Sequence, residues 1–207
     1  MVRRMMDDSV GAQDVLEMAE AAGEVPEYWK TGIECTINIG QLARVEQYRE
    51  ILATREENPK CCEGHSEGYA TVTAHRAACL LGEWKVADSI EEKLAKLIGE
   101  IESGEVKGEK SAIVGNLAHL QGVRLAIEGD LEGAIERFKA ADHDMTYIPA
   151  STGLFKLYNR LILAETLFAS GMDGKAHKVL SKVRSVNPYM VERFEERGLK
   201  VLGLERE

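Results

Sequence analysis

The chain has 207 residues, of which 44% are hydrophobic and 29% are charged, and its formal net charge is −9. Enough apolar residues are present for a packed core, which excludes the intrinsically disordered class. The acidic balance disfavours general nucleic-acid binding, because neutralising phosphates requires a basic face. Residues 139–187 are mildly basic and form a local exception.

No segment of the sequence has the pattern of an export signal or a membrane span. Residues 1–8 are partly basic, but no apolar run follows them as it would in a signal peptide. No stretch approaches the roughly 18 apolar residues that a membrane-spanning helix needs. Four cysteines are too few for a disulfide scaffold. We therefore expect a cytoplasmic protein that does not bind membranes.

Helices are the expected secondary structure, since Pro is scarce while Ala, Glu, Leu and Lys are common. The first expected element is an N-terminal capping helix within residues 1–25, which Gly23 and Pro26 close. Residues 26–188 are expected to form four helical hairpins, at about 26–60, 66–102, 111–146 and 152–187. A C-terminal capping helix is expected over residues 189–207, with apolar positions at Met190, Phe194, Leu199 and Leu202.

Each hairpin is predicted from a glycine that separates two amphipathic helical patterns. These glycines recur every 42 to 47 residues, at Gly40, Gly82, Gly129 and Gly171. Apolar residues three, four and seven positions apart flank each of them, as on one face of a helix. Glycine suits the end of a helix because it accepts the left-handed backbone conformation. The sequence therefore predicts an all-α protein built from repeated helix–turn–helix units.

The units resemble the tetratricopeptide repeat family, most clearly in the third and fourth. The third unit has the family's pattern at Gly122, Leu125, Gly129-Asp130, Ala134 and Phe138. The fourth has it at Leu163-Ala164, Leu167, Gly171, Ala176, Leu180 and Pro188. The period is longer than the family's 34 residues. The resemblance implies a right-handed α-solenoid of about four antiparallel hairpins with capping helices at both ends.

In such a solenoid the first helix of each hairpin lines a concave groove. The resemblance implies that the groove holds a peptide or a helix of a partner protein. The residues expected to face the groove are Lys30, Glu34, Asn38, Tyr69, Arg76, Asn116, His119, Tyr158, Leu161, Glu165 and Phe168.

A group of cysteines and histidines is the strongest candidate for metal binding. His75 and Cys79 are four residues apart on a predicted helix and therefore share a face. Together with Cys61, Cys62 or His65 they offer the mixed nitrogen and sulfur ligands that zinc prefers. Their spacing matches no closed zinc motif, and packing of His75 and Cys79 in the interior is the favoured alternative.

No catalytic motif supports an enzyme. Asp142-His143-Asp144 resembles an acid–base triplet but falls where the third hairpin ends, which favours a solvated helix terminus. The sequence has no phosphate-binding loop, no nucleophile elbow and no zinc-protease motif. We therefore expect a protein without a cofactor that is not an enzyme.

Three functions remain open from the sequence. The leading expectation is an adaptor or scaffold that binds a protein or peptide, with homo-oligomerisation as a further option. The second is a regulatory or sensor domain that binds a small ligand, or a metal at the cluster of residues 61–79. The third is the non-catalytic helical part of a larger protein.

Overall fold

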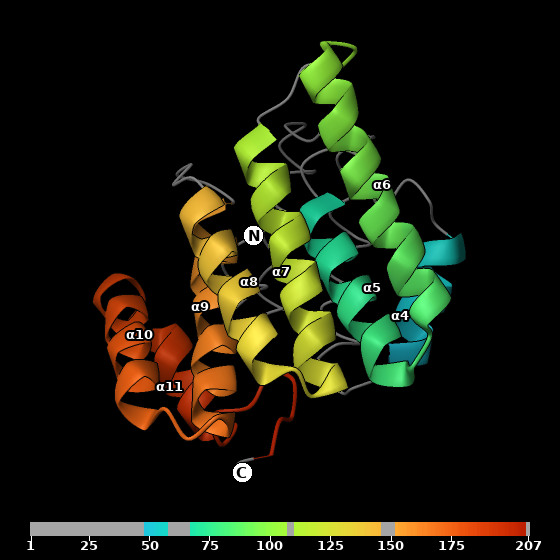
Figure 1. Ribbon diagram of the computed structural model, residues 1–207. Helices are drawn as coiled ribbons and strands as arrows, with labels where there is room; N and C mark the ends of the chain where they lie inside the picture. The colour runs from blue at the N-terminus through green and yellow to red at the C-terminus, as the bar shows by residue number, and fades with distance from the viewer. Residues whose placement is uncertain (1–47, 58–66, 107–109, 146–151, 206–207) are drawn as a thin grey trace, which may run out of the picture. The chain divides into compact units, whose positions relative to one another are not determined.

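The computed structural model describes residues 48–57, 67–106, 110–145 and 152–205 (Figure 1). These residues form helices and no strand, so the predicted all-α class is confirmed for this part of the chain. The predicted N-terminal helix and the turn at Gly40 lie outside the described residues. The helices are α4 (Tyr48–Glu57), α5 (Glu67–Leu81), α6 (Trp84–Ser103), α7 (Lys110–Glu128), α8 (Leu131–Asp144), α9 (Thr152–Ala169), α10 (Asp173–Val186) and α11 (Pro188–Glu196).

The chain divides into two compact units, residues 1–87 and 88–207. In the first unit α4 packs against α5. Three alanines of α5 are fully buried, at Ala74, Ala77 and Ala78. Gly82 ends this helix with φ +73°, and the amide of Glu83 donates to the carbonyl of Ala78 at 2.9 Å.

In the second unit consecutive helices from α7 to α11 pack against one another (Figure 1). Gly129 and Gly171 end α7 and α9 with φ of +92° and +68°. After each glycine, the next amide donates back into the preceding helix, from Asp130 to Leu125 at 2.9 Å and from Met172 to Leu167 at 2.8 Å. The repeated glycine pattern in the sequence therefore marks the same helix-ending turn at both positions.

Small residues allow close approach where α7 crosses α8. A Cβ atom added to Gly122 would lie 2.7 Å from Cε1 of Phe138. A Cβ added to Gly115 would lie 2.8 Å from the side chain of Met145, at the end of α8. Ala134 is fully buried in α8, as is Ala176 in α10. The small residues of the repeat pattern therefore lie at tight helix crossings or in the core.

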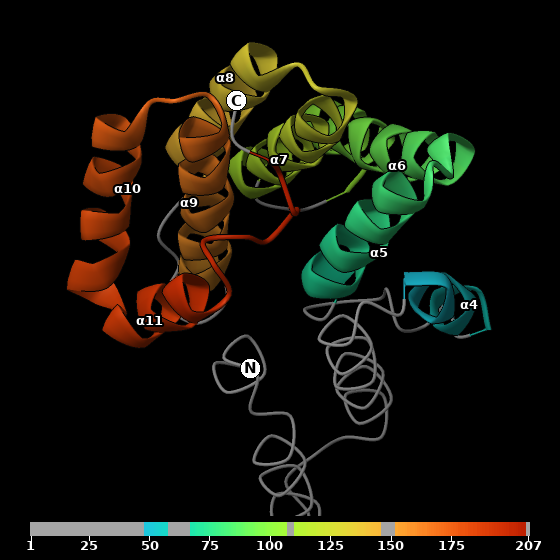
Figure 2. The same ribbon diagram turned by 90° about the horizontal axis from the view of Figure 1, so that it is seen from below.

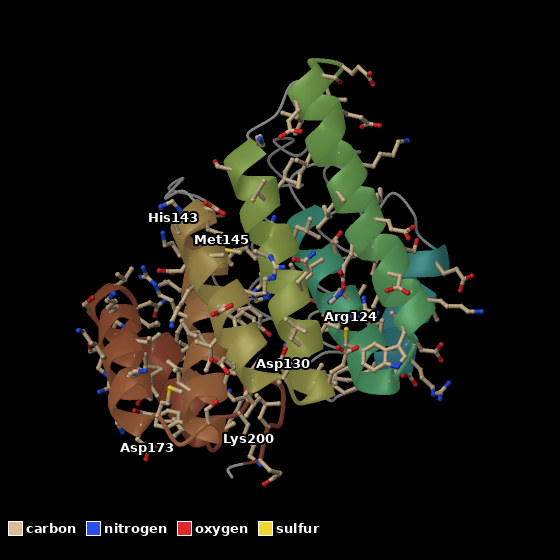
Figure 3. All side chains as sticks on the ribbon, in the orientation of Figure 1. Arg124, Asp130, His143, Met145, Asp173 and Lys200 are labelled. Atoms are coloured by element: carbon tan, nitrogen blue, oxygen red, sulfur yellow. The ribbon has the colours of Figure 1, made fainter. Side chains whose placement is uncertain are left out.

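Charged side chains link neighbouring helices in this unit. Arg124 of α7 contacts Asp88 of α6 at 2.7 Å and Glu91 at 3.3 Å (Figure 3). These carboxylates raise the pKa of Arg124, with the hydrogen bond to Asp88 as the largest cause. Arg160 of α9 donates to both oxygens of Asp142 at the end of α8, at 2.6 and 3.1 Å. These ion pairs connect α6 to α7 and α8 to α9.

The C-terminal helix is shorter than the sequence pattern indicates. α11 ends at Glu196 and does not continue to residue 207 as expected. Gly198 and Leu199 follow with φ of +68° and +63°, values that are incompatible with a right-handed α-helix. Residues 199–205, called the tail from here on, run back from α11 past α9 (Figure 2). The apolar residue Leu202 is buried in the tail and not on a helix.

No helix within the described ranges is both long enough and apolar enough to span a bilayer.

Candidate partner-binding face

The residues expected to face a groove fall into three groups. Lys30, Glu34 and Asn38 lie outside the described residues. Tyr69 and Arg76 lie in α5 of the first unit, where Arg76 is half-buried. The others lie in α7 and α9 of the second unit, at Asn116, His119, Tyr158, Leu161, Glu165 and Phe168.

Two of these residues, from different helices, come together. The ring of His119 in α7 lies 6.2 Å from the ring of Tyr158 in α9, measured between centroids and at an angle of 48°. Asn116 precedes His119 by one turn of α7, so the two share a helix face. Asn116 and Tyr158 are half-buried, whereas His119 is 2% exposed. The first helices of the third and fourth predicted hairpins therefore share a surface, which we call the α7–α9 face and define by Asn116, His119 and Tyr158.

A buried polar residue below this face fixes the orientation of His119. Nδ1 of His119 lies 2.8 Å from Oδ1 of Asn159, whose Nδ2 donates to the carbonyl of Phe138 at 2.9 Å. Because the amide nitrogen of Asn159 is used as a donor, its oxygen accepts, and His119 must carry a proton on Nδ1. Asn159 is fully buried and was not expected from the sequence. Its only sequence signal is a polar residue beside the apolar stripe of α9.

The side chain of Asn116 carries a buried amide oxygen. Oδ1 of Asn116 is buried and accepts no hydrogen bond from the part of the chain that the structure describes. A buried amide oxygen without a donor is energetically costly, and such atoms deserve a structural explanation. Because this atom is inaccessible to solvent, it belongs to the interior below the face.

Farther along α9, the other predicted groove residues are covered. Leu161, Glu165 and Phe168 are all buried, with 5%, 2% and 3% of their surface exposed. They follow Tyr158 at helical spacing, and Tyr158, Leu161, Glu165 and Phe168 therefore lie along one side of α9.

The carboxylate of Glu165 binds the main chain of the tail. Oε2 accepts the amides of Val201 at 2.7 Å and Leu202 at 2.8 Å, and Oε1 accepts the amide of Leu204 at 3.0 Å. Burial raises the pKa of Glu165 above the ordinary value, while these amide donors act in the opposite direction. The carboxylate is therefore the acceptor for these tail amides, which have no other partner among the described hydrogen bonds.

The candidate metal ligands are only partly within the described residues. His75 and Cys79 are buried in α5, and Sγ of Cys79 lies 3.7 Å from Nδ1 of His75. This agrees with the expectation that the two share a helix face. Cys61, Cys62 and His65 lie outside the described ranges. Within those ranges no three potential metal ligands lie close enough together to hold an ion.

The Asp142-His143-Asp144 sequence lies in the last turn of α8 (Figure 3). The side chain of His143 is 88% exposed and its Nδ1 lies 2.9 Å from Oδ1 of Asp144. Asp142 instead pairs with Arg160. Asp142 therefore has a different partner from His143 and Asp144, and the three side chains do not converge on one site.

A concave surface lies between α10 and α11. It is a hollow of about 420 Å³ lined by His177, Leu180, Ser181, Arg184, Ser185 and Glu195. Arg184 in this hollow is paired with Glu195. The charge of Arg184 is therefore balanced by Glu195 within the hollow. None of the predicted groove residues lines it.

Comparison of the chain with protein-family models, curated proteins and solved structures found no match.

Proposed function

We propose that this chain is a non-catalytic helical-repeat adaptor of the tetratricopeptide kind, which binds an extended segment of a partner protein along α7 and α9. The observation that carries the proposal is the contact between Glu165 and the tail. A side chain on the predicted inner side of α9 accepts the main-chain amides of three tail residues, at 2.7 to 3.0 Å. This side of α9 thus has the chemistry needed to bind a peptide through its backbone.

The α7–α9 face adds side chains suited to a protein partner. Tyr158 presents a half-buried aromatic ring, a side-chain type enriched where protein interfaces bind most strongly. Asn116 contributes a half-buried polar side chain on the same face. His119, whose ring is positioned by Asn159, packs against the ring of Tyr158. Rigid support of this kind limits the conformational entropy lost on binding.

The cytoplasm is the proposed location. Cys79 is buried and forms no disulfide among the described residues, which suits a reducing compartment.

Mutation of the α7–α9 face tests the proposal. The tagged full-length chain is used to capture partners from cell extract, and the captured protein is then quantified against variants. Tyr158→Ala is expected to weaken partner binding about tenfold, because buried aromatic anchors commonly contribute more than 1 kcal/mol. Asn116→Ala is expected to weaken it less, since the face loses one half-buried polar side chain.

Lys139→Ala is the matched control, because Lys139 is exposed on α8 and outside the face. It is expected to leave capture unchanged. Capture that survives both Asn116→Ala and Tyr158→Ala, with the fold intact by circular dichroism, would show that the partner binds elsewhere.

A further inference from the structure

We propose that the tail occupies part of the partner's binding site, and that the partner displaces it with a segment of the same apolar–Gly–apolar pattern as Leu202-Gly203-Leu204. This inference rests on the proposed function. It adds that the tail covers part of the partner's site in the free chain and that the partner segment resembles the tail chemically.

The position of the tail supports competition with a partner. Glu165 follows Tyr158 by seven residues in α9, so the two lie on the same side, about two turns apart. A segment bound at Tyr158 and extending toward the C-terminal end of α9 would therefore meet the tail at Glu165. Figure 2 shows the tail passing beside α9 on its way back from α11.

The contacts define what the site recognises. The amides of Val201, Leu202 and Leu204 converge on one carboxylate, as in the backbone nests that bind anions. The side chain of Leu202 is 6% exposed. Recognition therefore combines a main-chain turn with the buried side chain of Leu202 and the half-buried side chain of Leu204.

Gly203 explains why the pattern includes glycine. Its φ is +78°, a conformation that residues with a side chain rarely adopt. Yet an added Cβ would contact nothing within 4 Å. The turn therefore requires glycine because of its positive φ and not because space for a side chain is lacking. A competing segment must adopt the same positive φ.

Part of the tail is exposed to solvent, which favours its displacement. Lys200, Gly203 and Glu205 are exposed, and the ion pair between Lys200 and Glu205 lies at the surface, where such pairs contribute little. The non-glycine residue Leu199 adopts φ +63° at the turn that leads into the tail. That conformation is strained for leucine, and release of the tail relieves it.

The test uses a fluorescent peptide with the sequence of residues 199–207 and the full-length chain. The wild-type chain is expected to bind this peptide weakly, because its own tail fills the site. Leu202→Asp removes the buried anchor of the tail and leaves α9 unchanged. This variant is expected to bind the peptide at least about tenfold more tightly, since the fraction of open sites sets the apparent affinity.

Three controls identify the site. A peptide carrying Gly203→Val is expected not to bind the Leu202→Asp chain. Adding Glu165→Gln to that chain is expected to abolish binding of the original peptide. Glu205→Gln, which changes only an exposed charge of the tail, should behave as wild type.

Hydrogen exchange verifies that the tail is released, through faster exchange of the Val201 and Leu204 amides. If Leu202→Asp does not fold, the full-length Gly203→Val variant replaces it, because the position has open space around it. A folded variant with a released tail that still does not bind the peptide would overturn this inference. That result would leave the proposed function standing, because partner capture through Asn116 and Tyr158 is measured independently.

Discussion

The ring of Phe138 in α8 lies directly over the backbone of Gly122 in α7, leaving no space for a Cβ atom. An added Cβ would lie 2.7 to 3.1 Å from three ring carbons. Phe138 is fully buried, so its ring has little freedom to move away. This crossing joins the two helices of the third predicted hairpin, and α7 also carries Asn116 and His119.

Gly122→Ala is therefore expected to destabilise the protein by about 1–3 kcal/mol, as overpacking of a core does. Urea unfolding measures the change. Gly99→Ala is the matched control: Gly99 lies in α6 with nothing within 4 Å of an added Cβ. This control should stabilise the protein by roughly 0.5–1 kcal/mol, because alanine favours helix over glycine. Equal effects at both positions would contradict the close crossing.

Two helix starts in the second unit differ in their caps. Asp130 accepts the amide of Gly133 at 2.9 Å and caps α8 (Figure 3), whereas Met172 at the start of α10 makes no capping hydrogen bond. Asp130→Ala is expected to cost about 1 kcal/mol, while Met172→Asp is expected to gain about 0.5–1 kcal/mol. Thermal unfolding of both variants would reveal opposite shifts in Tm. A loss of stability in Met172→Asp would show that the α10 terminus needs no cap.

The helices and their turns were predictable from the sequence because local chemistry sets them. Gly82, Gly129 and Gly171 have positive φ between helices, as the spacing of glycine and apolar residues predicted. The family resemblance placed His119 and Tyr158 on the first helices of the third and fourth hairpins, and their ring centroids lie 6.2 Å apart. For the helices and their turns, the signal lies within a few residues of the feature.

The tail contact was not predictable, because it joins residues 36 to 39 positions apart. Apolar spacing favoured a helix through Leu199 and Leu202, but the turn at Gly198 ends it and frees the next amides for Glu165. Glu165 was expected on an open groove and is buried instead. A single glutamate in an apolar stripe looks the same in the sequence whether it faces solvent or another segment. Asn159 was missed for the same reason.

The buried carboxylate of Glu165 predicts a specific pH dependence. Its pKa is raised in the folded state, so folded protein binds the proton more tightly than unfolded protein does. The contribution of this group to stability is therefore fully present below the ordinary pKa and is lost as pH rises through the raised pKa.

Glu165→Gln removes this titration. The free energy of unfolding of the wild type, relative to that of Glu165→Gln, is therefore expected to fall as pH rises from about 4.5, the ordinary value. Urea unfolding of both proteins across this range measures it. The variant also places an amide NH₂ against the tail amides, so faster hydrogen exchange is expected at Val201 and Leu202. A difference that grows with pH would contradict the raised pKa.

The most direct test of the proposed binding site is a hydrogen-exchange footprint of the full-length chain with its captured partner. We expect the partner to slow exchange in α7 around Asn116 and in α9 around Tyr158, to speed exchange of the tail amides, and to leave the exposed side of α8 around Lys139 unchanged. Slowed exchange on α8 or α10 alone, with α7, α9 and the tail unaffected, would contradict binding along α7 and α9.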